Sequence, residues 1–327
     1  MTRTVLGIDT SNYRTSVALV SERREILLNV RELLPVPQGE RGLRQNEAVY
    51  AHLRQLAASA DKVRKASDGS VAAVAASTAP RDGKDSYMPV FTAGASFAQL
   101  MAAAMGVPFV GTTHQRGHLA AAKEGTELEG AEDYLALHLS GGTTDLLEVR
   151  KENIRQIGGS KDLHAGQLVD RVGVALGLPF PSGPELETLA LKGQCEGLLG
   201  CSMEGGDLFC HFSGTESQAQ RLIRDHQISG ENLAREIYDL LARTVARLLC
   251  AGAEATGFRK ALVTGGVASS GLFREMLLRR ISGKRNGPQI VFGKPEMSGD
   301  NAVGVALIGL NALLRNIKAP EAERREL

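Results

Sequence analysis

The chain has 327 residues, of which 43% are hydrophobic and 23% are charged, with 38 basic side chains against 37 acidic ones. These fractions are typical of a globular protein and exclude a disordered or fibrous chain. Because single cores stop growing at about 250–300 residues, the length favours two lobes over one. The formal net charge of +1 excludes a protein that binds polyanions through a broad cationic field. With 9 Phe, 5 Tyr and no Trp, contact with RNA would depend on a local patch or a partner.

The four cysteines form no CxxC pair and are too few for a disulfide framework, so they are expected to be free thiols in a reducing cytoplasm. Three of them, Cys195, Cys201 and Cys210, could bind zinc with His211, although their spacing fits no common finger. The N-terminus shows no charged-then-apolar leader, which predicts a cytoplasmic protein. The longest apolar stretch, 302–314, is too short to span a bilayer.

The first part of the chain alternates between strand and helix patterns. A helix is indicated by five apolar residues that recur at spacings of 4, 3, 4 and 3 from Val49 to Val63. A second helix is expected at 93–105. Strands are expected at 4–9, 15–20, 71–78 and 107–110.

The second part repeats the opening plan, with strands at 134–140 and 144–150 around a small polar turn. A long helix is indicated by the apolar stripe from Leu233 to Leu249, with Gly257 as its C-terminal stop. A strand at 260–264 and a helix from about Ser270 follow. The alternation predicts an α/β fold, with a charged tail at the C-terminus.

Three turns of small residues follow apolar strands, where α/β proteins place ligands. They contain Asp9 with Thr10, then Ser140 with Gly141 and Gly142, then Gly265 with Gly266. Glycine permits a positive φ and close backbone approach, so its amides can surround a phosphate. A single turn of this kind most often only connects two elements and binds no ligand. Three of them on two similar hairpins favour a nucleotide cleft between two lobes, as in the actin, sugar-kinase and Hsp70 fold.

His114 and His118 are four residues apart, which in a helix puts both imidazoles on one face, as two ligands of one divalent metal would be. A solvated pair at a helix start is the alternative. Gln115 replaces the glutamate of the HExxH protease pattern, which excludes that protease chemistry. A metal held by two imidazoles needs a further carboxylate, which the spacing does not identify.

A glycine stripe lies further along the chain. Gly166, Asp170, Gly173 and Gly177 share one helical face. This bare face suits either of two neighbours. One is a ligand whose hydroxyls donate hydrogen bonds to Asp170, and the other is a second helix packed closely against it. The residues alone do not favour one over the other.

Ordered motifs over nearly the whole chain resemble the tRNA threonylcarbamoyladenosine transferases, formerly called O-sialoglycoprotein endopeptidases. These motifs are LGIDTS, HQRGH, ALHLSGG, LGLPFPSGP, HFSGTES, VTGGVASSGLFR and GDNAVGVALIG. The resemblance implies a two-lobed actin-like fold, with residues 1–112 and 301–327 in one lobe and 113–300 in the other. It also implies transfer of a threonylcarbamoyl group from its AMP ester to N6 of a tRNA adenosine next to the anticodon.

The same resemblance implies one divalent metal, iron or zinc, on His114, His118 and Asp300. It places the adenylate against the Ser140-Gly141-Gly142 turn, Asp170 and Gly183. Thr143, Gly265, Gly266 and Ser270 are further candidates for substrate contact. Asp9 is a candidate to take the proton of the adenosine amine. Contact with tRNA is expected to need partner subunits, one of which could be an actin-like paralogue.

Five positions differ from the pattern of the family: Tyr13 and Arg14 replace acidic residues, and Arg116, Thr143 and Ser270 replace Glu, His and Asn. The chain therefore resembles a diverged paralogue. Two interpretations follow, an acyltransferase or a nucleotide-binding paralogue that scaffolds an active transferase complex. A basic patch of Arg279, Arg280, Lys284 and Arg285 is either a contact for tRNA or a solvated helix end.

Overall fold

The computed structural model describes residues 2–11, 13–36, 43–67, 71–83, 86–151, 153–299 and 302–318. The chain forms two compact units, residues 1–122 together with 299–327, and residues 123–298. The lobe boundaries expected from the sequence stay a prediction. No helix in the described ranges combines the length and apolar character that a membrane span requires.

The first unit is built on a five-stranded sheet with the order β3-β2-β1-β4-β5. Its first three strands are antiparallel, and β4 and β5 run parallel to β1. The strands are β1 (Thr4–Thr10), β2 (Arg14–Ser21), β3 (Ile26–Leu33), β4 (Val71–Ala79) and β5 (Phe109–Thr113). Every residue of β1 is buried, as expected for a central strand covered on both faces.

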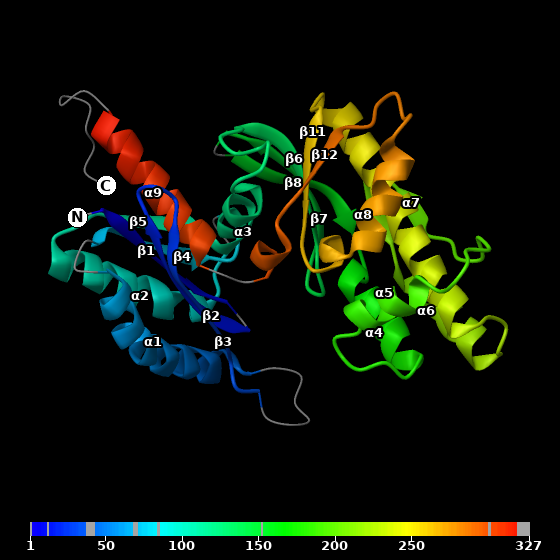
Figure 1. Cartoon of the computed structure of the whole chain (residues 1–327), viewed down its shortest axis with the longest axis horizontal. Helices are drawn as coiled ribbons and strands as arrows, with labels where there is room; N and C mark the ends of the chain where they lie inside the picture. The colour runs from blue at the N-terminus through cyan, green and yellow to red at the C-terminus, as the bar shows by residue number, and fades with distance from the viewer. Residues whose placement is uncertain are drawn as a thin grey trace. The chain divides into compact units, whose positions relative to one another are not determined.

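Helices cover both faces of this sheet. Helices α1 (Gln45–Ser67) and α2 (Pro89–Met105) lie on one side and α9 (Val303–Lys318) on the other (Figure 1). The close approach of α9 requires glycine in β1, because a Cβ at Gly7 would lie 2.5 Å from the carbonyl oxygen of Ala302. Helix α3 (His114–Lys123) follows β5 directly and packs against α9. The packing requires glycine in α9, because a Cβ at Gly304 would clash with the carbonyl oxygen of Gly117.

The second unit has a seven-stranded sheet with the order β12-β11-β6-β7-β8-β10-β9. Five of its strands, β8-β7-β6-β11-β12, repeat the order and the directions of the first sheet. The hairpin repeat expected from the sequence is therefore present. The strands are β6 (Asp133–Leu139), β7 (Thr144–Arg150), β8 (Asn153–Ser160), β9 (Ser202–Glu204), β10 (Phe209–His211), β11 (Lys260–Thr264) and β12 (Gln289–Phe292).

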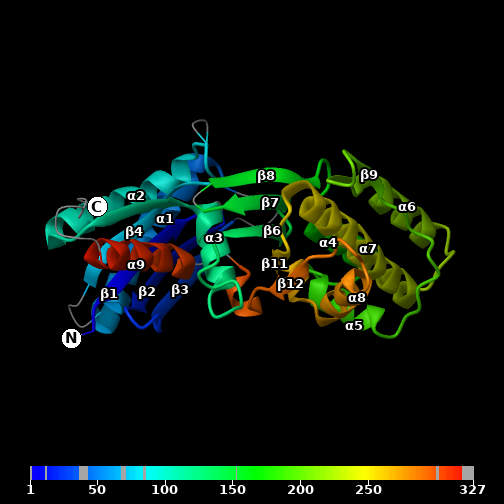
Figure 2. The same cartoon turned by 90° about the horizontal axis from the view of Figure 1, so that it is seen from above.

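Helix α7 (Gly230–Thr256) runs along this sheet and beside α8 (Gly271–Ile281) (Figure 2). It begins after Ser229, whose side chain accepts a hydrogen bond from the amide of Asn232, and it ends at Gly257 with φ +76°. Both the helix and its stop agree with the sequence prediction. The remaining helices are α4 (Ala165–Ala175), α5 (Gly183–Ala190), α6 (Ser213–Arg224) and the short 3-10 turns η1 (Val267–Ser269) and η2 (Pro295–Met297).

One strand lies two residues later than predicted. The amide of Val107 donates to the carbonyl of Ala102 and closes the end of α2 together with Gly106, whose φ is +64°. This C-terminal cap uses the donor that a strand would need, so β5 begins only at Phe109.

Candidate metal and nucleotide sites

In the first unit, Asp9 lies near the end of β1 and His114 is the first residue of α3. The Asp9 carboxylate is 1% exposed and accepts a hydrogen bond from the Ser77 hydroxyl. Its two oxygens lie 2.9 and 3.0 Å from Nδ1 of His114. A carboxylate only accepts, so Nδ1 of His114 carries the proton and the lone pair is on Nε2.

His118 lies one helical turn further and faces the same side, as predicted. Its Nε2 atom is 3.0 Å from Nε2 of His114, with the two rings nearly perpendicular at 78°. In the absence of a metal, one Nε2–H can donate to the other nitrogen. The pair is therefore a directed arrangement rather than two independently solvated side chains.

The donor set fits a divalent transition metal. Two metal–nitrogen bonds of about 2.0–2.1 Å span roughly 3 Å when they meet near a right angle, which matches the separation of the two Nε2 atoms. A carboxylate on the far nitrogen of a ligating histidine is the usual support for such a ligand. The described residues contain no group of three metal-binding side chains, and Asp300 lies outside them. Imidazole suits iron and zinc equally.

The surroundings of Asp9 bear on its expected role as a base. Its side chain is enclosed, and Ser77 and His114 use both of its oxygens. The geometry favours Asp9 as a residue that positions His114, and its assignment as a proton acceptor stays a prediction.

In the second unit, a pocket of about 470 Å³ gathers six of the nine residues expected to contact substrate. These are Ser140, Gly141, Asp170, Gly183, Gly266 and Ser270. They come from the turn after β6, from α4, from the start of α5 and from the turn after β11. Their role as ligand contacts stays a prediction, but the structure brings them together within one unit.

The other three expected residues shape the turns around this pocket. Thr143 accepts a hydrogen bond from the amide of Ser140 and closes the first turn. The φ of Gly142 does not lie in the left-handed region, so the first turn forms without the positive φ that glycine permits there. Gly265 adopts φ +104°, and a Cβ there would lie 2.1 Å from the carbonyl oxygen of Leu139.

Gly166 and Gly173 of the glycine stripe lie in α4 and permit close packing, and Gly166 also lines the pocket. The prediction that Gly177 shares their helical face is wrong, because α4 ends at Ala175 and Gly177 adopts φ +83°. A Cβ on Gly166 would lie 2.5 Å from the amide nitrogen of Gly141, and one on Gly173 would lie 2.2 Å from Cβ of Ser182. Asp170 lines the pocket and accepts from the amide of Ser182 at 2.8 Å. Burial raises the pKa of Asp170 above its usual value.

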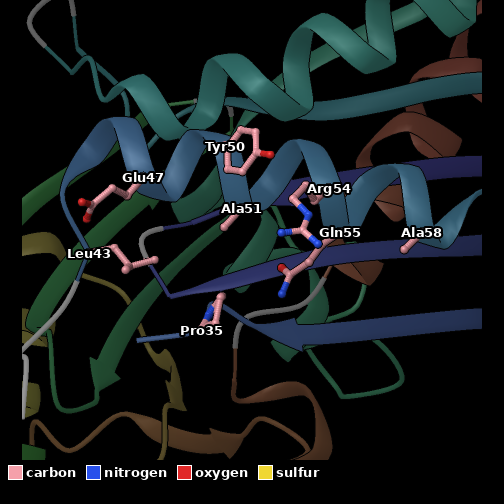
Figure 3. A pocket seen from close by; sticks show the side chains of 8 residues that line it. All are labelled: Pro35, Leu43, Glu47, Tyr50, Ala51, Arg54, Gln55 and Ala58. Atoms are coloured by element: carbon pink, nitrogen blue, oxygen red, sulfur yellow. The ribbon is translucent and has the colours of Figure 1, made fainter. Parts of the chain in front are cut away.

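Two lining residues were missed by the sequence analysis. Glu187 of α5 accepts from the amide of Leu272, and the Tyr238 hydroxyl donates to the carbonyl of Gly183 at 3.0 Å. Tyr238 is part of the apolar stripe of α7, so its spacing alone indicates only a core position. A separate hollow of about 570 Å³ lies beside α1, where Glu47, Tyr50 and Arg54 project (Figure 3), and it contains none of the expected site residues.

The profile of the tRNA N6-adenosine threonylcarbamoyltransferases matches residues 44–306. The chain belongs to this family. It is 28% identical to the transferase of Thermococcus gammatolerans over 316 residues, which is 96% of this chain and 92% of the relative. It is 31% identical to the transferase of Caldivirga maquilingensis over 318 residues, which is 94% of this chain and 89% of the relative.

Solved structures show the fold. The ROK hexokinase of Thermus thermophilus matches with TM-score 0.55 and 16% identity, over 95% of this chain and 99% of that one. The activator of 2-hydroxyisocaproyl-CoA dehydratase from Clostridium difficile, solved with bound ADPNP, matches with TM-score 0.55 and 15% identity, over 96% and 97%. The α/β, actin-like fold expected for this threonylcarbamoyltransferase-family chain is thereby confirmed.

Proposed function

We propose that this chain transfers a threonylcarbamoyl group from threonylcarbamoyl-AMP to N6 of a tRNA adenosine next to the anticodon, in a metal-dependent reaction. Membership of the transferase family over most of the chain supports this proposal. The six residues around one pocket that were expected to contact substrate add to it.

In this proposal His114, His118 and Asp300 hold one divalent ion, iron or zinc. When bound, the ion supplies a Lewis acid that polarises and orients the acyl group. Asp9 keeps the proton of His114 on Nδ1, so that the lone pair for the ion is on Nε2. In the pocket, the backbone of Ser140 and Gly141 contacts the phosphate, and Asp170 accepts from hydroxyls of the nucleotide.

The partner proposal is that tRNA binds with the help of other subunits, one of which is an actin-like paralogue, in the cytoplasm. Within the basic patch, Arg279 pairs with Glu275 and Arg280 with Asp239. Among the residues that the structure describes, Lys284 and Arg285 form no ion pair, so these two are the cations available to a phosphate backbone.

The alternative function is a nucleotide-binding paralogue that scaffolds an active transferase complex. It is favoured by Arg116, which lies midway between His114 and His118 in the sequence, where the resemblance implies a glutamate. Its guanidinium binds both oxygens of Asp82 at 2.7 and 2.9 Å, so a fixed cation replaces the expected anion.

One complementation experiment separates the two functions. The chain and its His114→Ala variant are expressed in a strain depleted of its own transferase, and threonylcarbamoyladenosine in bulk tRNA is quantified by mass spectrometry. We expect the parent chain to restore the nucleoside and the variant to fail. Absence of restoration by the parent, with adenylate binding retained in calorimetry, would support the scaffold instead.

A further inference from the structure

Two cysteines lie together at the β9 edge of the second sheet, and the proposed transfer reaction uses neither. Cys201 directly precedes β9, and Cys210 lies in β10 opposite Met203. Alternation along the two antiparallel strands puts Cys201 and Cys210 on one face as diagonal neighbours. Cys201 is partly exposed, whereas Cys210 is 0% exposed.

Basic side chains outnumber acidic ones around Cys201, where the acidic residues are Asp207, Glu254 and Asp162. It lines a hollow of about 770 Å³ together with Arg243, Arg247, Lys284 and Arg285. Lys284 and Arg285 have no ion pair within the described ranges, whereas Arg247 pairs with Asp207 at 2.7 Å. Partly exposed cysteines beside such cations are the ones that ionise and react at neutral pH.

Hydrogen bonding separates the two thiols. Interactions with the Cys210 thiol first, and then with Thr244 and the His211 backbone, lower the pKa of Cys201 to about 7 against the opposing effects of burial and of Asp162. When Cys201 is protonated, its S–H group donates only a weak hydrogen bond to the carbonyl oxygen of His211, 3.5 Å from Sγ. The pKa of Cys210 is raised, first by its bond to Cys201 and then by burial. At neutral pH Cys201 is therefore the thiol of the pair that is substantially ionised, and Cys210 stays protonated.

We propose that Cys201 is a peroxide-reactive thiol and that Cys210 is the thiol that converts its oxidised form into a disulfide. The Cys201 thiolate attacks one oxygen of hydrogen peroxide, the O–O bond breaks, and hydroxide leaves while the sulfur becomes a sulfenic acid. The sulfur gives up two electrons and the peroxide accepts them. Cys210 then attacks the Cys201 sulfur, an S–S bond forms, and the sulfenic oxygen leaves as water with the Cys210 proton.

The first step prepares the second. A sulfenic acid at Cys201 is neutral, so the negative charge that keeps Cys210 protonated is removed when Cys201 is oxidised. Cys210 is then easier to ionise, and it lies diagonally next to Cys201 on the same face of the β9–β10 ladder. The hollow gives peroxide access to Cys201, whereas the buried Cys210 reacts only through its neighbour.

Cys195 provides an internal control. It is exposed, but partial burial of its sulfur, with Glu236 nearby as a hydrogen-bond acceptor, raises its pKa to about 11. At pH 7 about half of Cys201 and about one in 10⁴ of Cys195 are ionised, and the lower nucleophilicity of the more acidic thiol reduces the ratio of rates to about 10².

The first experiment measures alkylation by iodoacetamide on the full chain as a function of pH. Peptide mass spectrometry is used to read Cys201 and Cys195 separately. We expect Cys201 to react about 10²-fold faster than Cys195 at pH 7, with a midpoint near pH 7. Equal rates, or a Cys201 midpoint near 8.5, would overturn the proposal without the use of any variant.

The second experiment treats the chain with hydrogen peroxide and locates the bond. Cys195, Cys201 and Cys210 share one tryptic fragment, because no Lys or Arg lies between Lys192 and Arg221. A bridge lowers the mass of this fragment by two hydrogens. Cleavage after both Glu196 and Glu204 separates the three cysteines, so that only a Cys201–Cys210 disulfide joins the piece 197–204 to the piece that begins at Gly205.

The expected result is this bridge in the parent chain and in Cys195→Ser, and its loss in Cys201→Ser. In Cys210→Ala, dimedone should trap a sulfenic acid at Cys201. A parent chain that accumulates trapped sulfenic acid without the bridge would refute the role of Cys210, and a bridge that forms instead to Cys195 would refute the assigned pair.

Discussion

Replacement of Asp9 by asparagine tests whether the carboxylate prepares His114 for a metal. Both oxygens of Asp9 lie within 3.0 Å of Nδ1 of His114. Whichever way the amide of Asp9→Asn faces, its NH2 group opposes the Nδ1 proton. The remaining amide oxygen is a neutral and weaker acceptor for that proton, so the imidazole loses its preference for Nδ1–H. The other tautomer, with the proton on Nε2, the nitrogen that faces His118, then becomes populated.

The magnitude follows from the hydrogen bond that is lost. A hydrogen bond to a charged group contributes about 1.5–3 kcal/mol to stability. Loss of a carboxylate behind a ligating histidine typically weakens metal binding by about 10–100-fold, or about 1.4–2.7 kcal/mol. We expect Asp9→Asn to weaken zinc binding by this factor, and His114→Ala to abolish it.

The assay is calorimetric titration of zinc into the purified chain, with thermal unfolding used to confirm that each variant is folded. Asp82→Asn is the matched control, because Asp82 binds Arg116 and Thr113 in the same unit and does not contact the histidine pair. Zinc affinity unchanged in Asp9→Asn, or lowered equally in Asp82→Asn, would refute the tautomer argument.

Three further outcomes are expected. Gly166→Ala should lower the free energy of unfolding by about 1–3 kcal/mol, because its Cβ would lie 2.5 Å from a backbone nitrogen. In the control Gly142→Ala, the new Cβ meets nothing within 4 Å and should change the melting temperature little. Equal melting temperatures of the two variants would contradict this prediction. If tRNA contacts the basic patch, log K for tRNA binding falls as log salt concentration rises. Replacing both Lys284 and Arg285 by alanine should make this slope shallower by about 0.7–0.9 per lost contact. An unchanged slope would show that the patch is only a solvated helix end. Partial burial raises the pKa of Asp239, but its partners Arg280 and Arg243 outweigh this effect and lower the pKa below the ordinary value. The contribution of the Asp239 carboxylate to folding stability is therefore complete above about pH 4, and it is lost as the pH falls through the folded-state pKa. Urea unfolding of the parent and Asp239→Asn should therefore differ at pH 7 and converge in acid, and a difference that persists at pH 2 would show that the charge is not responsible.

Local periodicity was sufficient for much of the fold. The apolar stripe of α7 and its glycine stop, the buried strand β4 and the repeated hairpin β6–β7 were all predicted with boundaries close to those observed. The same periodicity put His114 and His118 on one face of α3, because the rotation per residue of a helix is fixed. These features depend on residues only a few positions apart.

Where the sequence pattern fitted two structures equally, packing made the choice. The glycines of α4 suited a ligand or a neighbouring backbone, and the structure puts Gly166 against the turn at Gly141. The pattern around Val107 suited a strand, but its amide completes the cap of α2. In the folded chain a backbone donor is bonded to a particular acceptor, and a bare helix face packs against a particular neighbour. Secondary-structure propensity does not identify either partner.

What only the tertiary structure decided are the pairings between distant residues. Asp9 and His114 are 105 residues apart, and they meet because β1, β4 and β5 lie side by side and end at one edge of the sheet. Tyr238 reaches the pocket from α7 across 55 residues, and Cys201 meets Cys210 only through the β9–β10 ladder. Sequence periodicity determines which face of an element a side chain occupies, whereas strand order and register determine which faces meet.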